Sequence, residues 1–435
     1  MVVGKRIASR ETSMSSEQVE SSTMTWPDVV NIPRENIRTF VAERLFKVAS
    51  SRSGVTILLD RDKDSAWRAA AGAPTIRIHN PKAFFTRLGH TGLIGLGESY
   101  MAGEWDSEDL PAALGRFSER LGNLVPPALA KLRALFLPRH PETHVNTIES
   151  ARKNIEAHYD LSNELFQTFL DETLTYSSAL FTEEEPIAGS ILVAEWDELA
   201  DASRRKIDRL LDRTRVGTGS RVLEIGTGWG ELAVRAARRG AIVTTLTLSK
   251  EQAAYVENRV AEEGLSDLIE VQVRDYREAE GQFDAIISVE MIEAVGKEHW
   301  VEYYQTIDQH LAPNGLAGIQ AITMPHERML ATANTYTWIQ KYIFPGGFLP
   351  SRRGIREDVE KNTSMRVIED YDFGFQYGET LRLWRERFDS AAERVEALGF
   401  DETFRRMWRL YLAYSEAGFR SRYLNVSQIL FARPS

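Results

Sequence analysis

Four short apolar runs alternate with helix-like segments in the middle of the chain, and this alternation most constrains the fold. The runs are "RVLEIG", "AIVTTLTL", "IEVQVRD" and "FDAIISV", all within residues 221–289. Segments typical of amphipathic helices, such as residues 231–239 and 250–263, separate them. Strands that alternate with helices pair in parallel and are covered by helices on both faces. We therefore predict an α/β fold with a doubly wound, Rossmann-like sheet for residues 145–435.

The remaining segments predict three further parts. Residues 1–30 are polar and aperiodic, which is typical of a disordered tail. Residues 31–140 combine a helical pattern with two strand-like runs and predict a smaller α+β domain. Residues 323–400 are rich in aromatic side chains, and we expect them to form an α-rich lid insertion. Ligands bind at the carboxyl edge of a doubly wound sheet, so we expect the lid to cover that edge.

Charge and cysteine content exclude several classes of function. The chain has no cysteine, which rules out disulfides, thiolate metal sites and a cysteine nucleophile. Its eight histidines lack metal-site spacing, so we expect no metal. A formal net charge of −10 argues against a nucleic-acid partner. No apolar run approaches the roughly 18 residues of a membrane span, and the first residues do not resemble a signal peptide, so we expect a cytoplasmic protein.

A glycine-rich turn follows the first strand-like run. In "EIGTGWGE", Gly226, Gly228 and Gly230 are two residues apart and precede a predicted helix. Such glycines let the backbone approach a ligand at the start of a helix. A dinucleotide fingerprint needs its third glycine where this chain has Glu231. The spacing instead suits a nucleoside with an amino-acid tail, and S-adenosylmethionine is the natural candidate.

Acidic and polar residues near the strand ends support this cofactor. Glu224 precedes the first glycine and can reach the amino end of the tail, and Asp275 can accept a hydrogen bond from an adenine amino group. The second strand lacks the acidic residue that commonly binds ribose hydroxyls. "TLTLSKEQ" offers Thr247, Ser249 and Gln252 there instead.

The stretch "SVEMIEAVG" places Glu290 and Glu293 just after an apolar run, with no lysine or arginine between them. Two interpretations are open. Acids in the first turn of a helix stabilise it by roughly 0.3 to 1 kcal/mol through the helix dipole. Alternatively, the two carboxylates belong to a catalytic site.

The ordered set of motifs resembles the cyclopropane fatty acid synthase and mycolic acid methyltransferase family. It runs from "LIGLGESYMAGEW" through "HYDLSNELF", "LTYSSALF", "VLEIGTGWGE", "LTLSKEQ" and "SVEMIEAVG" to "WIQKYIFPGGFLPS" and "FRSRYL". Within the family, the chain is most similar to actinobacterial enzymes that make 10-methylene fatty acids, precursors of 10-methyl branched, tuberculostearic-type lipids. The resemblance implies a class I S-adenosylmethionine-dependent methyltransferase fold.

The resemblance also implies roles for particular residues. Those that it places on the cofactor are Tyr176, Ser177, Gly226, Gly228, Thr247, Leu248, Gln252, Asp275 and Tyr276. It implies a bicarbonate that acts as general base, held by the backbone at Ser178 and Ile322 and by the side chains of Glu293 and Tyr377. It places Tyr159 and Tyr411 in the wall of the acyl pocket.

Three departures from the family pattern bear on the product. Most relatives have cysteine in place of Ser178, histidine in place of Gln320 and a small residue in place of Glu290. Gln320 can hold a bicarbonate by hydrogen bonds but cannot accept its proton as an imidazole could. We hypothesise that Glu290 and Gln320 together favour an open 10-methylene product over a cyclopropane.

The implied reaction sets physical requirements on the site. Attack of an alkene on a sulfonium methyl group moves positive charge onto the substrate, so the site must exclude water and offer negative charge or aromatic faces. Candidates are Glu290, Glu293, Tyr336, Trp338, Tyr342, Phe344 and Tyr377, although core packing is the alternative for at least half of the aromatic residues.

We therefore expect methylation of a phospholipid-bound cis-unsaturated chain, with oleoyl as the expected acyl group, by an enzyme peripheral to the inner face of the membrane. A separate flavin- or nicotinamide-dependent reductase would saturate the methylene, and the family suggests a homodimer. The alternatives are cyclopropane formation, a methyltransferase for a small soluble molecule, and a non-catalytic cofactor-binding protein.

Overall fold

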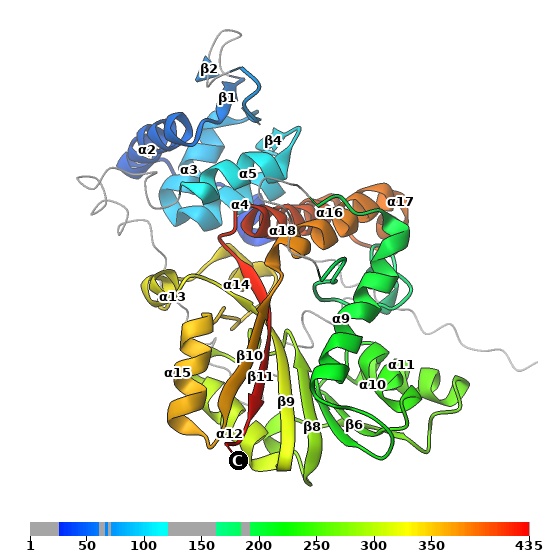
Figure 1. Ribbon diagram of the computed structural model, residues 1–435. Helices are drawn as coiled ribbons and strands as arrows, with labels where there is room; N and C mark the ends of the chain where they lie inside the picture. The colour runs from blue at the N-terminus through cyan, green and yellow to red at the C-terminus, as the bar shows by residue number, and fades with distance from the viewer. Residues whose placement is uncertain (1–25, 61–65, 68–70, 121–161, 184–191, 435) are drawn as a thin grey trace, which may run out of the picture.

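The computed structural model describes residues 26–60, 66–67, 71–120, 162–183 and 192–434. A seven-stranded sheet with the order β10-β11-β9-β8-β5-β6-β7 forms its larger part (Figure 1). The strands are β5 Arg221–Ile225, β6 Ile242–Thr247, β7 Ile269–Val273, β8 Phe283–Val289, β9 Leu311–Thr323, β10 Arg366–Asp372 and β11 Asn425–Ala432. The four apolar runs predicted as strands correspond to β5 to β8.

The strand order places a ligand-binding edge at the centre of this sheet. Strands β5 to β9 are parallel, whereas β11 runs antiparallel to β9 and β10 antiparallel to β11. From β5 the chain proceeds outward through β6 and β7, and then returns to the other side of β5 as β8. Such a reversal opens a crevice beyond the carboxyl ends of the strands.

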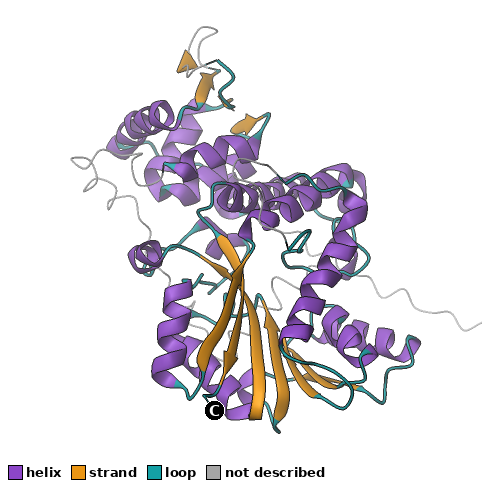
Figure 2. Ribbon diagram, in the orientation of Figure 1, coloured by secondary structure: helices purple, strands orange, loops and turns teal. Residues whose placement is uncertain are grey.

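Helices cover both faces of the sheet (Figure 2). One apolar core joins the sheet to α9 Leu199–Arg213, α10 Glu231–Arg238 and α11 Lys250–Glu262. The other joins it to α12 Trp300–His310 and α15 Arg352–Asn362. The predicted doubly wound α/β fold is confirmed.

The N-terminal unit has a four-stranded sheet with the order β2-β1-β3-β4. Its elements are α1 Pro27–Val30, α2 Ile37–Ser53, β1 Thr56–Leu59, β2 Ala66–Trp67, β3 Thr75–Ile78, α3 Pro81–Thr91, α4 Leu93–Met101, β4 Trp105–Ser107 and α5 Leu110–Glu119. The predicted tail is wrong for its last residues, because Val29 is buried and the Arg87 guanidinium donates to the backbone carbonyls of Asp28 and Val29, at 2.6 Å each. Burial and hydrogen bonds together order this segment.

The predicted lid, residues 323–400, is divided between two parts of the fold. Within it, α15 and β10 belong to the layers of the main sheet. The other elements are α13 His326–Thr332, α14 Trp338–Tyr342, α16 Gly374–Ser390 and α17 Ala392–Ala397. Helix α16 packs against α18 Glu402–Arg420, and both lie between the main sheet and the N-terminal unit (Figure 1).

Candidate active site

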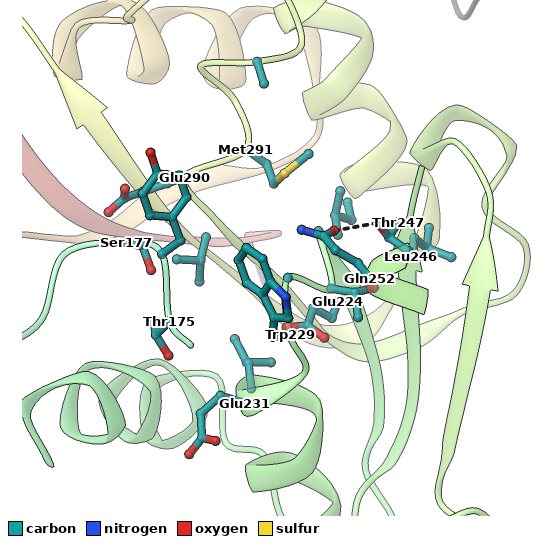
Figure 3. Close-up of a pocket in the computed structure, with 18 of the residues that line it drawn as sticks. Thr175, Ser177, Glu224, Trp229, Glu231, Leu246, Thr247, Gln252, Glu290 and Met291 are labelled. Atoms are coloured by element: carbon teal, nitrogen blue, oxygen red, sulfur yellow. Dashed lines mark hydrogen bonds between the residues drawn. The ribbon is translucent and has the colours of Figure 1, made fainter. Parts of the chain in front are cut away.

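A pocket opens at the carboxyl edge of β5, β6 and β8 (Figure 3). Most of the predicted cofactor residues line it, namely Tyr176, Ser177, Glu224, Gly226, Gly228, Thr247, Leu248, Gln252, Asp275 and Tyr276. Glu290 lies on one side of Trp229 and Gln252 on the other (Figure 3). The main sheet therefore brings together residues from five separate segments of the chain.

Two glycines of the turn between β5 and α10 allow other segments to pack closely against it. Gly226 has φ +96°, and a Cβ there would lie 2.5 Å from Cγ of Met291, so the turn and the segment after β8 pack in contact. Gly230 does not line the pocket. It caps α10 with φ +86°, and a Cβ would lie 2.9 Å from Val256. The structure thus shows a packing role for Gly230, and its cofactor contact stays a prediction.

Glu224 is a buried carboxyl group suited to a cationic ligand. Its side chain is 3% exposed, and Oε2 accepts a hydrogen bond from the Thr245 hydroxyl at 2.6 Å. Burial raises the pKa of Glu224 to about 8, an effect that the Thr245 bond opposes. A bound ammonium group would offset the cost of burying the charged form. The residue thus fits the amino end of S-adenosylmethionine.

The opposite end of the pocket offers amide and carboxylate groups. The Thr247 hydroxyl donates to Oε1 of Gln252 at 2.9 Å, and the amide nitrogen of Gln252 faces the pocket (Figure 3). Asp275 accepts a bidentate pair of hydrogen bonds from Arg277, at 2.8 Å from Nε and 2.9 Å from Nη2. This arginine, which the sequence pattern did not single out, holds the carboxylate predicted to meet adenine.

Glu290 is the centre of a hydrogen-bond network at the other end. Its Oε1 accepts from the Ser178 backbone nitrogen at 2.9 Å and from Gln320 Nε2 at 2.8 Å. Its Oε2 accepts from the Tyr377 hydroxyl at 2.7 Å. The structure therefore brings together four of the six predicted catalytic residues around one carboxylate.

The orientation of Gln320 follows from a chain of hydrogen bonds that begins at an arginine. Arg209 Nη1 donates to Oε1 of Gln428 at 2.8 Å, and because a guanidinium can only donate, the amide of Gln428 is oriented. Gln428 Nε2 in turn donates to Oε1 of Gln320 at 3.2 Å. Gln320 must then present its NH₂ group to Glu290. The Gln320 NH₂ group therefore needs a hydrogen-bond acceptor, and the Glu290 carboxylate is that acceptor.

Glu293 lies beside this network in a more apolar environment. Its Oε1 accepts from the Ile322 backbone nitrogen at 2.5 Å, while its Oε2 is buried and has no hydrogen-bond partner among the described residues. Burial, together with the charge of Glu290, raises the pKa of Glu293 to about 8. Residues 290–296 form turns rather than a helix, so the helix-start interpretation of the two acids is wrong.

The predicted bicarbonate does not fit this arrangement. The backbone nitrogen of Ser178 and the Tyr377 hydroxyl, two of its expected donors, bind Glu290 instead. The third expected donor, the backbone nitrogen of Ile322, binds Glu293. Carboxyl groups of the chain itself therefore take up the three donors expected for bicarbonate.

Sequence patterns also missed a buried lysine of the pocket. Lys206 is fully buried on the apolar stripe of α9, lines the pocket and donates to the Ser177 hydroxyl. Burial lowers the pKa of Lys206 to about 8, and the charges of Glu290 and Asp171 oppose that effect. A lysine at an apolar position of an amphipathic helix is the signal that could have revealed it.

The four predicted substrate residues have different surroundings. Tyr411 is buried, and its hydroxyl lies 2.7 Å from that of Tyr176. Tyr336 is partly buried against the core that contains Tyr411. Tyr342 donates to Glu98 of the N-terminal unit at 2.9 Å, so its hydroxyl serves an interface between parts of the chain. Tyr159 lies outside the described residues.

Known proteins resemble the chain over most of its length. Residues 146–429 match the mycolic acid cyclopropane synthetase family. Tuberculostearic acid methyltransferase UfaA1 of Mycobacterium tuberculosis is 48% identical over 410 residues, which cover 93% of this chain and 94% of that protein. Cyclopropane-fatty-acyl-phospholipid synthase of Escherichia coli (strain K12) is 32% identical over 419 residues, or 93% and 95% of the two chains.

A solved structure supports the same assignment. Mycolic acid cyclopropane synthase CmaA1, in complex with SAH and CTAB, is 28% identical and has a TM-score of 0.56, covering 64% of this chain and 97% of that one. The glycine turn, Glu224 and Gln252 fit the same class of cofactor. The chain therefore belongs to the mycolic acid cyclopropane synthetase family and is an S-adenosylmethionine-dependent methyltransferase.

Proposed function

We propose that the protein methylates the cis double bond of a phospholipid-bound oleoyl chain and releases a 10-methylene acyl lipid. The observation that carries the proposal is a buried aromatic cluster that continues from the cofactor pocket. Tyr176 lines the pocket and contacts Trp384, with ring centroids 5.4 Å apart. Tyr377 contacts Trp384 and Phe419 in the same core. The similarity to a tuberculostearic acid methyltransferase supports this choice of lipid.

Each part of this site answers a requirement of the chemistry. S-adenosylmethionine, when bound, supplies an electrophilic methyl group. The aromatic side chains exclude water, which would trap a cation as an alcohol, and their ring faces stabilise positive charge. Glu290 places negative charge at the junction of the pocket and the aromatic cluster. Lys206 also lines the pocket, and the negative charges of Glu290 and Asp171 offset its positive charge.

The fate of the cation decides the product. Addition of the methyl group to one alkene carbon leaves the charge on its neighbour. A 1,2-hydride shift followed by loss of a methyl proton gives the exomethylene, whereas proton loss with ring closure gives a cyclopropane. The position of the base and the orientation of the cation choose between the two. The departures at Glu290 and Gln320 support the open product.

The direct test is incubation of the full chain with S-adenosylmethionine and oleoyl phospholipid. Mass spectrometry and proton NMR of the released methyl esters then report the product. Vinylidene protons are the expected result. High-field ring protons would instead assign cyclopropane formation, and no product from an enzyme that binds SAH would refute the lipid function.

Association with the bilayer surface is part of the proposal, since the substrate resides there. No helix of the described part of the chain is both long and apolar enough to cross a membrane. Ile37 and Phe40 lie three residues apart on α2 and are 80% and 69% exposed, with exposed Arg34 and Arg38 beside them. Apolar side chains flanked by arginines suit the anionic inner face of a membrane. Flotation with vesicles of anionic lipid tests this, with Ile37→Ser/Phe40→Ser expected to weaken binding.

Two partners complete the proposal. Conversion of the methylene to a methyl branch consumes a hydride equivalent and a proton, which a separate flavin- or nicotinamide-dependent reductase would supply. The family resemblance supports a homodimer. Analytical ultracentrifugation tests the dimer, and addition of a reductase with its reduced cofactor should convert the vinylidene signals into those of a methyl branch.

A further inference from the structure

We propose that the Glu290 carboxylate is the general base of this reaction and takes the place of a bound bicarbonate. The inference rests on the proposed function and names the group that removes the proton. The donors expected to bind bicarbonate bind carboxyl groups of the chain instead.

The donors around Glu290 form a site built for an anion. Three hydrogen bonds reach it from different parts of the fold, from the backbone of Ser178, from Gln320 on β9 and from Tyr377 on α16. The chain from Arg209 through Gln428 orients the Gln320 amide as a donor. Such preorganised donors hold an ionised carboxylate in one position.

The network leaves the carboxylate able to accept a proton. A carboxylate has about four lone-pair sites, and the hydrogen bonds to Glu290 use two on Oε1 and one on Oε2. Among the described residues, no second donor is bonded to Oε2, which leaves a lone-pair site there for the proton. Glu290 is also one of the side chains that line the cofactor pocket, whereas Glu293 is not. Of the two acids, Glu290 is therefore the one placed to meet a substrate bound beside the cofactor.

The backbone at this position is in an uncommon conformation. Glu290 has φ +53°, in the left-handed region that a glutamate rarely adopts, and its backbone nitrogen donates to the Gln320 carbonyl at 2.7 Å. Left-handed conformations of residues other than glycine cost on the order of 1 to 3 kcal/mol and are concentrated at functional sites. A glycine would relieve this cost, so the carboxylate has a use that offsets it.

The charges that surround Glu290 suit a base. Burial raises the pKa of Glu290, while Lys206 on α9, Gln320, Ser178 and Tyr377 oppose that effect by favouring the ionised form. The raised pKa makes the carboxylate more basic than usual, which suits it to proton removal. Glu293 holds its proton up to a pH of about 8, so it adds little repulsion below that value.

The step balances within the chain and the substrate. After the hydride shift, the cationic carbon carries the new methyl group. One methyl proton passes to Oε2 of Glu290, and the electron pair of that C–H bond forms the C=C double bond of the exomethylene group. The carboxyl group becomes neutral and returns the proton to solvent before the next turnover.

The test compares wild-type enzyme with two substitutions, in buffer stripped of carbon dioxide and in the same buffer with added bicarbonate. Glu290→Gln keeps the size of the side chain but cannot accept the proton. Glu290→Gly relieves the backbone conformation and frees the donors of Ser178, Gln320 and Tyr377. Glu298→Gln is the matched control, because it removes the same charge from an exposed position in the short helix Lys297–His299 that follows this loop. Product formation from oleoyl phospholipid and SAH affinity by calorimetry are both measured.

We expect wild-type enzyme and Glu298→Gln to be active without bicarbonate and indifferent to its addition. Glu290→Gln should lose about 10² to 10⁴ in rate, the usual contribution of a general base, while it binds SAH as wild type does. Glu290→Gly should lose activity similarly and recover part of it when bicarbonate enters the freed site.

Two results would overturn the inference while leaving the proposed function intact. One is wild-type activity that disappears in bicarbonate-free buffer and returns on addition. The other is Glu290→Gln turning over at the wild-type rate. Wild-type enzyme that binds SAH but yields no lipid product would instead refute the function itself.

Discussion

At the scale of single residues, burial gives two neighbouring glutamates different tasks. Glu290 has three hydrogen-bond donors and a nearby lysine, which favour its charged form. Glu293 has one donor and an oxygen without a partner, so its pKa rises to about 8. Paired acids whose surroundings differ in this way separate into a base and a neutral carboxyl group.

The raised pKa of Glu293 predicts how stability depends on pH. The folded protein binds this proton more tightly than the unfolded chain, whose carboxyl groups titrate near about 4.3. The contribution to the free energy of unfolding is therefore complete below that pH and is lost as the pH rises towards about 8. Urea unfolding of the ligand-free protein at pH 5 and 8.5 should show this decline, and Glu293→Gln should reduce it. An unchanged decline in Glu293→Gln would contradict the assignment, and Glu298→Gln is the control.

Gln320 predicts an effect on product rather than on stability. Gln320→His replaces a fixed amide donor next to Glu290 with a ring that can exchange protons. We expect the ratio of 10-methylene to cyclopropane product to fall, as measured by proton NMR of the methyl esters. If both Gln320→His and Glu290→Gly kept the wild-type ratio of 10-methylene to cyclopropane product, these positions would have no role in the choice of product.

At the scale of elements, the turn after β5 and the segment after β8 depend on each other. Gly226 leaves space that Met291 fills, so a side chain at 226 would displace the segment that carries Glu290. The cofactor pocket and the carboxylate network are thereby set by one contact between two loops.

Gly226→Ala should weaken SAH binding by about 10- to 100-fold, because overpacking costs typically 1 to 3 kcal/mol. Calorimetric titration with SAH measures the change. Gly219→Ala is the matched control, since Gly219 also has positive φ, at +79°, but a Cβ there meets nothing within 4 Å. That variant should lose roughly 1 kcal/mol of stability and bind SAH normally. Equal SAH affinities in the two variants would contradict the role of the Met291 contact.

At the scale of the whole molecule, the N-terminal unit holds part of the lid. Glu98 on α4 accepts hydrogen bonds from Lys341 at 2.5 Å and from Tyr342 at 2.9 Å, both on α14. A Cβ on Gly97 would lie 2.2 Å from the ring of Trp338, also on α14. The N-terminal unit therefore supports the aromatic segment that the sequence associates with the acyl chain.

Gly97→Ala should displace α14 and lower turnover of oleoyl phospholipid by more than about tenfold, with SAH affinity unchanged. Gly115→Ala on α5 is the control, because a Cβ there meets nothing within 4 Å. It should stabilise the helix by roughly 0.5 to 1 kcal/mol and leave turnover unchanged. Parallel rate and calorimetry measurements check both expectations, and wild-type turnover in Gly97→Ala would contradict them.

The sequence by itself determined the strands β5 to β8, the glycine turn and ten of the residues that line the cofactor pocket. These features depend on local periodicity and on residues close together in the chain, where the period of apolar side chains and the φ requirement of glycine act directly. The strands β9 to β11 and the division of the lid escaped prediction, because long-range pairing determines them.

Only the tertiary structure decided what the two acids of "SVEMIEAVG" do. The donors to Glu290 come from positions 178, 320 and 377, and the donor to Glu293 from position 322. The motif alone shows neither how deeply Glu290 and Glu293 are buried nor in which direction each side chain points. The structure showed that Glu290 binds two of the donors expected for an ion, because hydrogen-bond donors distant in sequence converge on its carboxylate.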